Sequence, residues 1–280
     1  MLTNPTLDSS SVVVITGAAT GIGRSMADAF TSRGARVVIA DIDEKAADTA
    51  AGEIAATGGQ AYAHQVNVTD PNSIEALADY VYAEFGRVDV LCNNAGVTMR
   101  PFRASWNASL RDFTWMLEVN YLGVVNGLLS FVPRMRDQPG HKHMVNTASF
   151  TALDTSPGHA AYAASKAAVI ALSDALRIEL QDQGDDFGVT VLYAGAIPSR
   201  LATSERLRPA EERSDQRHIE EYQSPRPAPF HYTPRPVEDV GPLVVQAVLA
   251  GSSACLTHRY PHEEIERRLA ELRAAAPSDG

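Results

Sequence analysis

Short apolar runs rich in β-branched residues alternate along the chain with segments whose apolar residues recur every three or four positions. The first run, Val12–Thr16, is almost wholly apolar, as is typical of a strand covered on both faces. Such runs predict strands at residues 12–16, 36–40, 61–66, 88–92, 143–147, 189–193 and, as a short seventh run, 254–257. Helical periodicity predicts helices at residues 22–33, 43–57, 72–85, 107–135 and 160–183. The alternation predicts an α/β fold, in which one doubly wound parallel sheet carries helices on both faces, as a single domain over residues 1–280.

Residues 198–240 interrupt this alternation. Eight of the chain's 16 prolines lie between Pro198 and Pro242, without apolar periodicity. The insertion leaves the carboxyl end of a central predicted strand, where open α/β sheets bind ligands, so we expect it to cover a substrate; the alternative is a disordered segment. A last helix is predicted at 261–275, with Ile265, Leu269 and Leu272 on one face that packs on the domain or on a second copy of the chain.

Composition narrows the range of partners. The chain has 34 acidic and 24 basic residues, and its formal charge of −10 repels nucleic-acid phosphates and anionic membranes. We therefore expect no nucleic-acid partner and no membrane partner, and we find no apolar window of spanning length and no signal segment at residues 1–10. Cys92 and Cys255 form neither a disulfide framework nor metal-ligand spacing, which predicts a cytoplasmic protein without a bound metal.

A glycine-rich turn joins the first predicted strand to the first helix. Gly17, Gly21 and Gly23 suit a tight turn, the close approach of a pyrophosphate and close helix packing, and the helix N-terminus favours an anion. Asp41 ends the second strand, about 20 residues further on, where a carboxylate accepts hydrogen bonds from a ribose and repels a 2′-phosphate. Because Ile42 and Asp43 supply no cation to neutralise such a phosphate, the pattern favours NAD over NADP. Arg24 and Arg36 are the nearest bases, and they are the residues that would favour NADP.

A tyrosine and a lysine, Tyr162 and Lys166, lie four residues apart on one face of a predicted helix. A phenol is a poor base at neutral pH, and a neighbouring ammonium lowers its pKa, so this pair suits acid/base chemistry. Ser149 follows the fifth strand and is expected at the same edge of the sheet.

Several motifs together resemble those of the short-chain dehydrogenase/reductases over about residues 10–200. They are, in the family's order and spacing, the glycine turn, Asn93-Asn94-Ala95-Gly96, Asn120 within Val119–Gly123, Ser149 and the Tyr162/Lys166 pair. The resemblance implies a seven-stranded Rossmann sheet, a homodimer or homotetramer, and hydride transfer between a nicotinamide and a small alcohol or ketone.

The resemblance also implies residue roles. Tyr162 would exchange the substrate proton, Ser149 would hold the substrate oxygen, Lys166 would bind the nicotinamide ribose and lower the Tyr162 pKa, and Asn120 would fix a water in a proton relay. The dinucleotide would contact Gly17, Thr20, Gly21, Ile22, Gly23, Asp41, Ile42, Asn67, Val68, Asn94, Ala95, Gly96, Tyr162, Lys166, Ile197 and Ser199.

This chain departs from the family pattern at three places. Asn67 stands where an aspartate usually reads the adenine amino group, so we expect a weaker adenine contact. Ala194 replaces a common proline before Gly195, which affects the expected backbone near Ile197. A charged helix replaces the glycine-rich tail that completes many tetramers, which favours a dimer.

A narrower resemblance concerns the substrate. The segments Asn126-Gly127, Phe131–Met135 and Ser204–Pro209 are similar to parts of the Cα-dehydrogenases that oxidise benzylic alcohols of lignin-derived aryl ethers. Mostly apolar or aromatic residues are candidates for the substrate pocket, namely Phe102, Thr151, Leu153, His159, Tyr193, Leu201 and Leu207. The prediction is an NAD-dependent oxidoreductase for a hydrophobic secondary alcohol; the alternatives are an NADP-dependent ketoreductase and a non-catalytic dinucleotide sensor.

Overall fold

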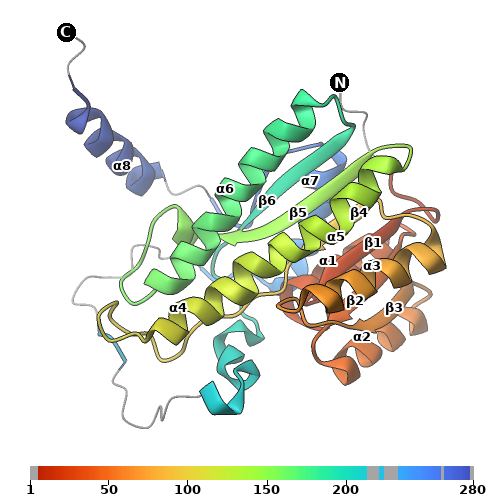
Figure 1. The fold of residues 1–280 in the computed structure, drawn as a ribbon, viewed down its shortest axis with the longest axis horizontal. Coiled ribbons are helices and arrows are strands. Elements are labelled where there is room, and N and C mark those ends of the chain that lie inside the picture. Colours follow the sequence, from red (N-terminus) through yellow and green to blue (C-terminus); the bar gives the residue numbers. More distant parts are fainter. Residues whose placement is uncertain (1–5, 213–220, 224–232, 260–261, 278–280) are drawn as a thin grey trace.

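The structure is a computed structural model that describes residues 6–212, 221–223, 233–259 and 262–277. Seven parallel strands form one sheet in the order β3-β2-β1-β4-β5-β6-β7 (Figure 1). Their bounds are β1 Val12–Thr16, β2 Arg36–Asp41, β3 Gln60–Gln65, β4 Val90–Asn93, β5 Lys142–Ser149, β6 Phe187–Ala194 and β7 Ala254–Leu256. The predicted Rossmann-type α/β fold is confirmed.

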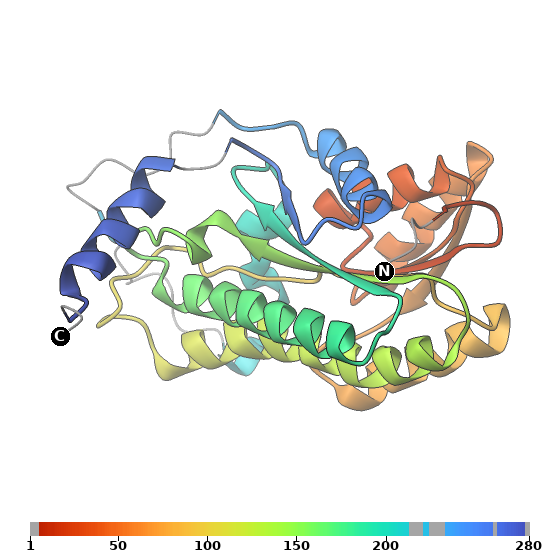
Figure 2. The ribbon, with the colours of Figure 1, turned by 90° about the horizontal axis from the view of Figure 1, so that it is seen from above.

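Eight α-helices are described. They are α1 Gly21–Thr31, α2 Glu44–Ala56, α3 Pro71–Phe85, α4 Leu110–Leu117, α5 Gly123–Asp137, α6 Ala160–Asp182, α7 Val240–Leu249 and α8 His262–Ala275. Helices α1, α2 and α7 pack on one face of the sheet and α3, α5 and α6 on the other, whereas α8 stands away from it (Figure 2). The predicted helix at 107–135 is α4 and α5 joined by a π-helix, η1 (Glu118–Leu122), and it begins only at Leu110, because Ser109 and Asp112 form a capping box there.

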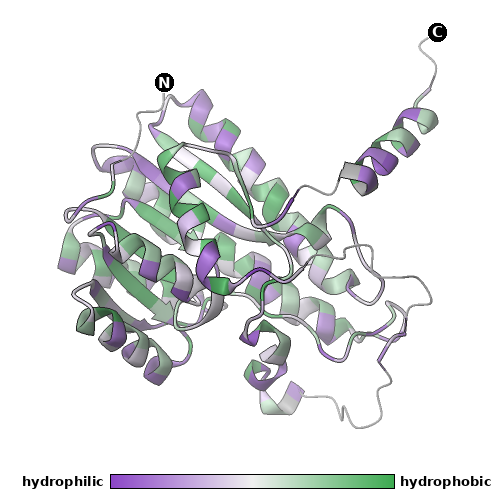
Figure 3. Cartoon of the chain, turned by 180° about the vertical axis from the view of Figure 1, so that it is seen from behind, coloured by the Kyte–Doolittle hydropathy of each residue, from purple (hydrophilic) through white to green (hydrophobic). Residues whose placement is uncertain are grey.

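Alternation along each strand builds two cores. Val13 and Ile15 of β1 pack with α1, α2 and α7, whereas Val12 and Val14 pack with α3, α5 and α6. Hydropathy colouring shows these apolar positions concentrated on the strands and on the inner helix faces (Figure 3). The sheet is therefore covered on both faces, as its uniformly apolar strands predict.

Helix α7 has no counterpart in the predicted elements. Its sequence is apolar almost throughout and follows the proline-rich insertion, so it shows little amphipathic periodicity. It packs tightly on α1, where a Cβ at Gly241 would lie 2.0 Å from the Ser25 carbonyl oxygen. Only a glycine permits this approach.

One helical run, Leu110–Asp137, is long and apolar enough by composition for a membrane span, in contrast to the expectation from sequence. In the described part of the chain no other helix meets that test. Phe131 and Met135 of this run belong to the core beneath the sheet, so core packing accounts for its hydropathy.

Candidate active site

A groove of about 340 Å³ opens at the carboxyl ends of the strands. It lies where the chain turns from the β1-β2-β3 half of the sheet to β4, which is where open α/β sheets bind ligands. The predicted cofactor and catalytic residues that line it are Gly17, Thr20, Gly21, Ile22, Asp41, Ile42, Asn67, Val68, Asn94, Ala95, Gly96, Ser149, Tyr162, Lys166, Ile197 and Ser199. Gly23 and Asn120 do not line the groove, but they contact Gly17 and Val97, which do.

The glycines of the turn are required by their geometry. Gly17 and Gly21 have φ values of 64° and 62°, in the left-handed region, and a Cβ on Gly17 would lie 2.8 Å from the Ala95 Cα. A Cβ on Gly23 would lie 2.3 Å from the Gly17 carbonyl oxygen. Thr20 caps α1 without a side-chain hydrogen bond, so the first amide groups of the helix are left for an anion in the groove. This cradle fits a dinucleotide pyrophosphate.

Two side chains fasten the glycine turn to the end of β4. The Thr16 hydroxyl oxygen accepts hydrogen bonds from the backbone amides of Asn94 (3.0 Å) and Ala95 (3.1 Å). The Asn94 side-chain amide donates to the carbonyl oxygens of Thr16 (3.0 Å) and Gly17 (3.2 Å). Asn94 thus fixes the shape of the cradle as well as bordering it, and Thr16 is a site residue that the sequence analysis did not select.

Asp41 is held in place at the end of β2. Its carboxylate accepts hydrogen bonds from the backbone amides of Ala19 (3.0 Å) and Asp43 (3.1 Å), one on each oxygen. Each oxygen has a further lone pair for a ribose hydroxyl. The Asn67 side-chain oxygen already accepts two hydrogen bonds from Thr69, so its expected contact with adenine competes with these bonds.

Asn120 lies inside the π-helix η1 and is wholly buried. Its side-chain amide donates to the Val97 carbonyl oxygen (3.0 Å) and the Ser165 hydroxyl (2.9 Å), and its oxygen accepts from the Val97 amide (2.8 Å). These bonds join α6 to the loop after β4. Both amide hydrogens are used within the protein, so the main effect of Asn120 is to hold α6 and this loop in place. A single π-turn is frequent at functional sites, but apolar periodicity does not reveal it.

Ser149, Tyr162 and Lys166 meet at one end of the groove. Ser149 is the last residue of β5, rather than lying just beyond it, and its hydroxyl donates to the Ala194 carbonyl oxygen at 3.3 Å. The Lys166 ammonium donates to the Thr147 carbonyl oxygen at 2.8 Å and lies 5.9 Å from the centroid of the Tyr162 ring. A Cβ on Gly96 would lie 3.2 Å from the Asn120 Oδ1, a tight contact, and 3.4 Å from the Lys166 Nζ, an ordinary one.

Burial governs the protonation of this group. It raises the pKa of Tyr162 to about 12, against a hydrogen bond from Ser149 that lowers it. Burial likewise lowers the pKa of Lys166 to about 8. The pKa of Tyr162 therefore lies above its ordinary value, in contrast to the lowering expected from Lys166, because burial disfavours the phenolate.

The substrate candidates divide into two groups. Leu201 and Leu207 line the groove, whereas Phe102, Thr151, Leu153, His159 and Tyr193 do not. Thr151 instead donates a hydrogen bond from its hydroxyl to that of Ser149 at 2.8 Å, which orients the Ser149 side chain. Phe102 and His159 stack on each other outside the groove, with ring centroids 3.8 Å apart. Tyr193 packs in the core between β6 and α6.

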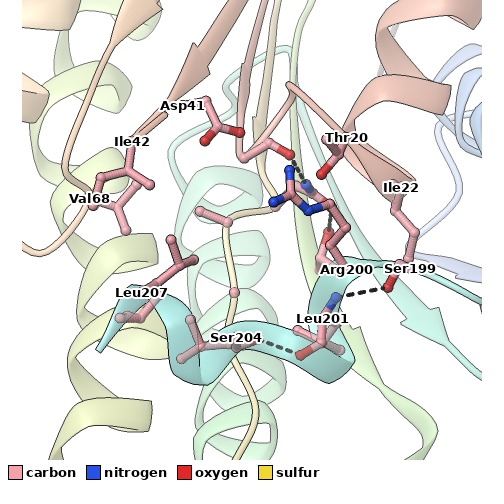
Figure 4. A pocket seen from close by; sticks show the side chains of 18 of the residues that line it. Thr20, Ile22, Asp41, Ile42, Val68, Ser199, Arg200, Leu201, Ser204 and Leu207 are labelled. Atoms are coloured by element: carbon pink, nitrogen blue, oxygen red, sulfur yellow. Dashed lines mark hydrogen bonds between the residues drawn. The ribbon is translucent and has the colours of Figure 1, made fainter. Parts of the chain in front are cut away.

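The first part of the insertion forms η3 (Arg200–Leu207), a short 3₁₀ segment across the groove (Figure 4). Most of the rest of the predicted substrate cover lies outside the described residues. Ile197 borders the groove together with Ala194, so the missing proline has not displaced it.

Arg200 and Arg206 also line the groove, whereas Arg24 pairs with Asp28 and Glu53 and Arg36 does not line it. Two of the cations that line the groove, Arg200 and Arg206, thus come from a segment remote in sequence from Asp41, which the sequence analysis did not consider.

The sequence profile of the short chain dehydrogenases matches residues 11–209. The chain belongs to this family. As a short-chain dehydrogenase it is an oxidoreductase that acts on CH–OH groups with a nicotinamide dinucleotide. Among the described residues no group of three His, Cys, Asp or Glu side chains is placed to hold a metal ion.

Individual relatives extend this result. The 1-deoxy-11-beta-hydroxypentalenate dehydrogenase of Streptomyces exfoliatus is 39% identical over 188 residues, 67% of this chain and 68% of that protein. The C alpha-dehydrogenase of Sphingobium sp. is 36% identical over 200 residues, 71% of this chain and 64% of that protein, in agreement with the narrower resemblance. A short chain dehydrogenase/reductase from Burkholderia phymatum, solved in complex with NAD, has a TM-score of 0.87 and 30% identity, with 99% of each chain covered.

Proposed function

We propose that this short-chain dehydrogenase transfers hydride between NAD and a hydrophobic secondary alcohol or ketone, with Tyr162 as the acid and base. The observation that carries the proposal is the arrangement of the groove. Asp41 ends β2 and the glycine cradle follows β1, whereas Ser149 ends β5 on the other side of β4, and all of them line the groove with Tyr162 and Lys166. A dinucleotide that lies along the groove therefore brings its nicotinamide to the phenol.

Each side chain has a separate task in oxidation. Ser149, oriented by Thr151, donates a hydrogen bond to the substrate oxygen. Tyr162 takes the proton from that oxygen, and Lys166 holds the nicotinamide ribose and stabilises the phenolate. When bound, the oxidised nicotinamide would supply the hydride acceptor and, before transfer, a positive charge near the phenol. Asn120 keeps α6 and the β4 loop in register, which sets the position of Tyr162.

The preference for NAD rests on Asp41. Its carboxylate is fixed by two backbone amides at the end of β2, where it would meet the adenosine ribose. A 2′-phosphate at that place would be repelled. Arg206 favours the alternative of an NADP-dependent ketoreductase, because it brings a cation to the same groove.

The proposed substrate class is based on apolar residues that line the groove together with Ser149 and Tyr162. Val97, Trp115 and Leu201 are apolar, and none of them suits a phosphate or a sugar. The two enzyme relatives are named as dehydrogenases of a hydroxypentalenate and of a Cα position. Aryl and terpenoid secondary alcohols are therefore the compounds to test first.

A screen of secondary alcohols with NAD, followed by NADH absorbance, tests the proposal. We expect turnover with aryl or terpenoid alcohols and little with polyols or phosphorylated sugars. Turnover confined to phosphorylated or polar alcohols would refute the substrate class, and higher kcat/KM with NADP than with NAD would refute the cofactor preference. Binding of dinucleotides without turnover of any alcohol or ketone would favour a sensor.

A further inference from the structure

Segment η3 lies over the adenosine half of the groove as well as the catalytic half. Leu207 lies on the side of the groove where Ile42 and Val68 are, and Leu201 lies on the side of Ile22 and Ser199 (Figure 4). The start of the insertion therefore reaches the ribose acid, Asp41, with which Arg206 and Leu207 share the groove.

A buried group of charges holds the end of η3 in this position. Arg208, directly after η3, is 2% exposed and pairs with Asp112 of α4 at 2.9 Å and with Glu205 at 2.9 Å. Arg103 pairs with the other oxygen of Asp112 at 2.5 Å. The Arg208 guanidinium also stacks on Trp115, 4.3 Å from its ring centroid. Because these groups are removed from water, η3 is a fixed part of the groove wall.

Arg206 projects from this fixed segment at the exposed rim of the groove. Its Nη1 donates to the carbonyl oxygens of Thr203 (2.9 Å) and Arg200 (3.2 Å), which limits the positions of the guanidinium. Arg206 and Asp41 both line the groove. Burial and Arg200 lower the pKa of Arg206, whereas Asp41 and Asp43 raise it. An arginine stays charged at neutral pH in such surroundings.

We propose that Arg206 is a cofactor-binding residue and forms, with Asp41, the pair that sets the choice between a free and a phosphorylated adenosine ribose. The inference rests on the proposed dinucleotide site. In the native pair the Asp41 carboxylate excludes a 2′-phosphate, and the guanidinium adds attraction for the anionic dinucleotide. Once the carboxylate is neutralised, the same guanidinium becomes the partner of a 2′-phosphate.

The test measures the dissociation constants of NADH and NADPH, by the fluorescence of the reduced nicotinamide, for four proteins. They are the wild type, Arg206→Gln, Asp41→Asn and Asp41→Asn/Arg206→Gln.

We expect Arg206→Gln to weaken NADH binding by about threefold to tenfold. We expect Asp41→Asn to tighten NADPH binding by about tenfold or more, and the double variant to lose most of that gain. Arg33→Gln, an equal loss of charge at an exposed position in the turn after α1, is the matched control and is expected to change neither constant.

The outcomes separate this inference from the proposed function. A wild type that binds neither dinucleotide overturns both. A wild type that binds NADH, with unchanged constants in Arg206→Gln and equal NADPH binding in Asp41→Asn and the double variant, overturns the role of Arg206 alone. A wild type that prefers NADPH refutes the proposed preference, and Arg206→Gln must then weaken NADPH binding for the inference to stand.

Discussion

The burial of Lys166 lowers folding stability at neutral pH, although the proposed reaction needs this side chain. Lys166 is 3% exposed, and its ammonium donates a hydrogen bond to the Thr147 carbonyl oxygen. Burial lowers its pKa from 10.5 to about 8. Between these values the unfolded chain binds the proton more strongly than the folded chain, so folding stability from this group rises with pH from about 8 to about 10.5. Below pH 8 the folded protein bears the cost of a buried charge.

Lys166→Met tests this residue. At pH 7 we expect the variant to be as stable as the wild type or more stable, because it removes a buried charge, while turnover falls by about a hundredfold or more. Urea denaturation at pH 7 and at pH 9.5 measures the effect, and the stability of the wild type relative to the variant should increase at the higher pH. A variant that is markedly less stable at pH 7, by about the same amount at both pH values, would mean that Lys166 is chiefly a structural residue.

Among the elements, α4 and η3 are joined by buried ion pairs whose loss the chain tolerates poorly. Asp112 is 1% exposed and faces both Arg103 and Arg208. Asp112→Asn is expected to lower the free energy of unfolding by about 3–5 kcal/mol, because two buried guanidinium groups lose their anionic partner. Asp28→Asn breaks the exposed pair with Arg24 and should cost less than about 1 kcal/mol. Equal effects of the two substitutions in urea denaturation would contradict the view that η3 is fixed by this cluster.

Elements whose apolar pattern is periodic could be predicted from the sequence. β1 was predicted with its bounds, and the glycine turn, Asp41 and the Tyr162/Lys166 pair were placed in one groove, because strand ends and helix spacing fix such positions locally. The π-turn around Asn120 was missed, since a one-residue bulge leaves little trace in hydropathy. Helix α7 was missed because it is apolar on all sides.

The contacts of the insertion could not be predicted in this way. Arg206 reaches the groove from a segment 165 residues after Asp41, and the buried pair of Arg208 with Asp112 on α4 holds the end of that segment. His159 and Phe102 looked like pocket residues in sequence, yet their rings contact each other at a tilt and neither lines the groove. Side-chain partners of loops depend on tertiary packing, which periodicity does not encode.

At the scale of the whole molecule, apolar side chains on the outside indicate assembly. Leu129 on α5 and Ile178 on α6 are 64% and 55% exposed, and Leu272 on α8 is 62% exposed. Helix α8 stands away from the body of the domain (Figures 1 and 2), with Leu269 and Leu272 exposed. We propose that a second copy of the chain covers these faces in a homodimer or homotetramer.

Light scattering coupled to size-exclusion chromatography tests this proposal. The wild type should have the mass of a dimer or tetramer, and Leu269→Ser/Leu272→Ser should shift it toward a smaller species without loss of α-helix content. Glu266→Ser, also exposed on α8, is the control and should leave the mass unchanged. A monomeric wild type at all concentrations would exclude the proposed assembly.

The most direct test of the account is the rate of NADH formation by Tyr162→Phe, measured with the best alcohol found for the wild type. The substitution removes the hydroxyl and keeps the ring. We therefore expect kcat to fall by about a hundredfold to ten-thousandfold, with NADH binding within about twofold of the wild type. Tyr80→Phe, on α3 and stacked on His64 away from the groove, should keep full activity. Turnover by Tyr162→Phe close to that of the wild type would show that another group moves the proton.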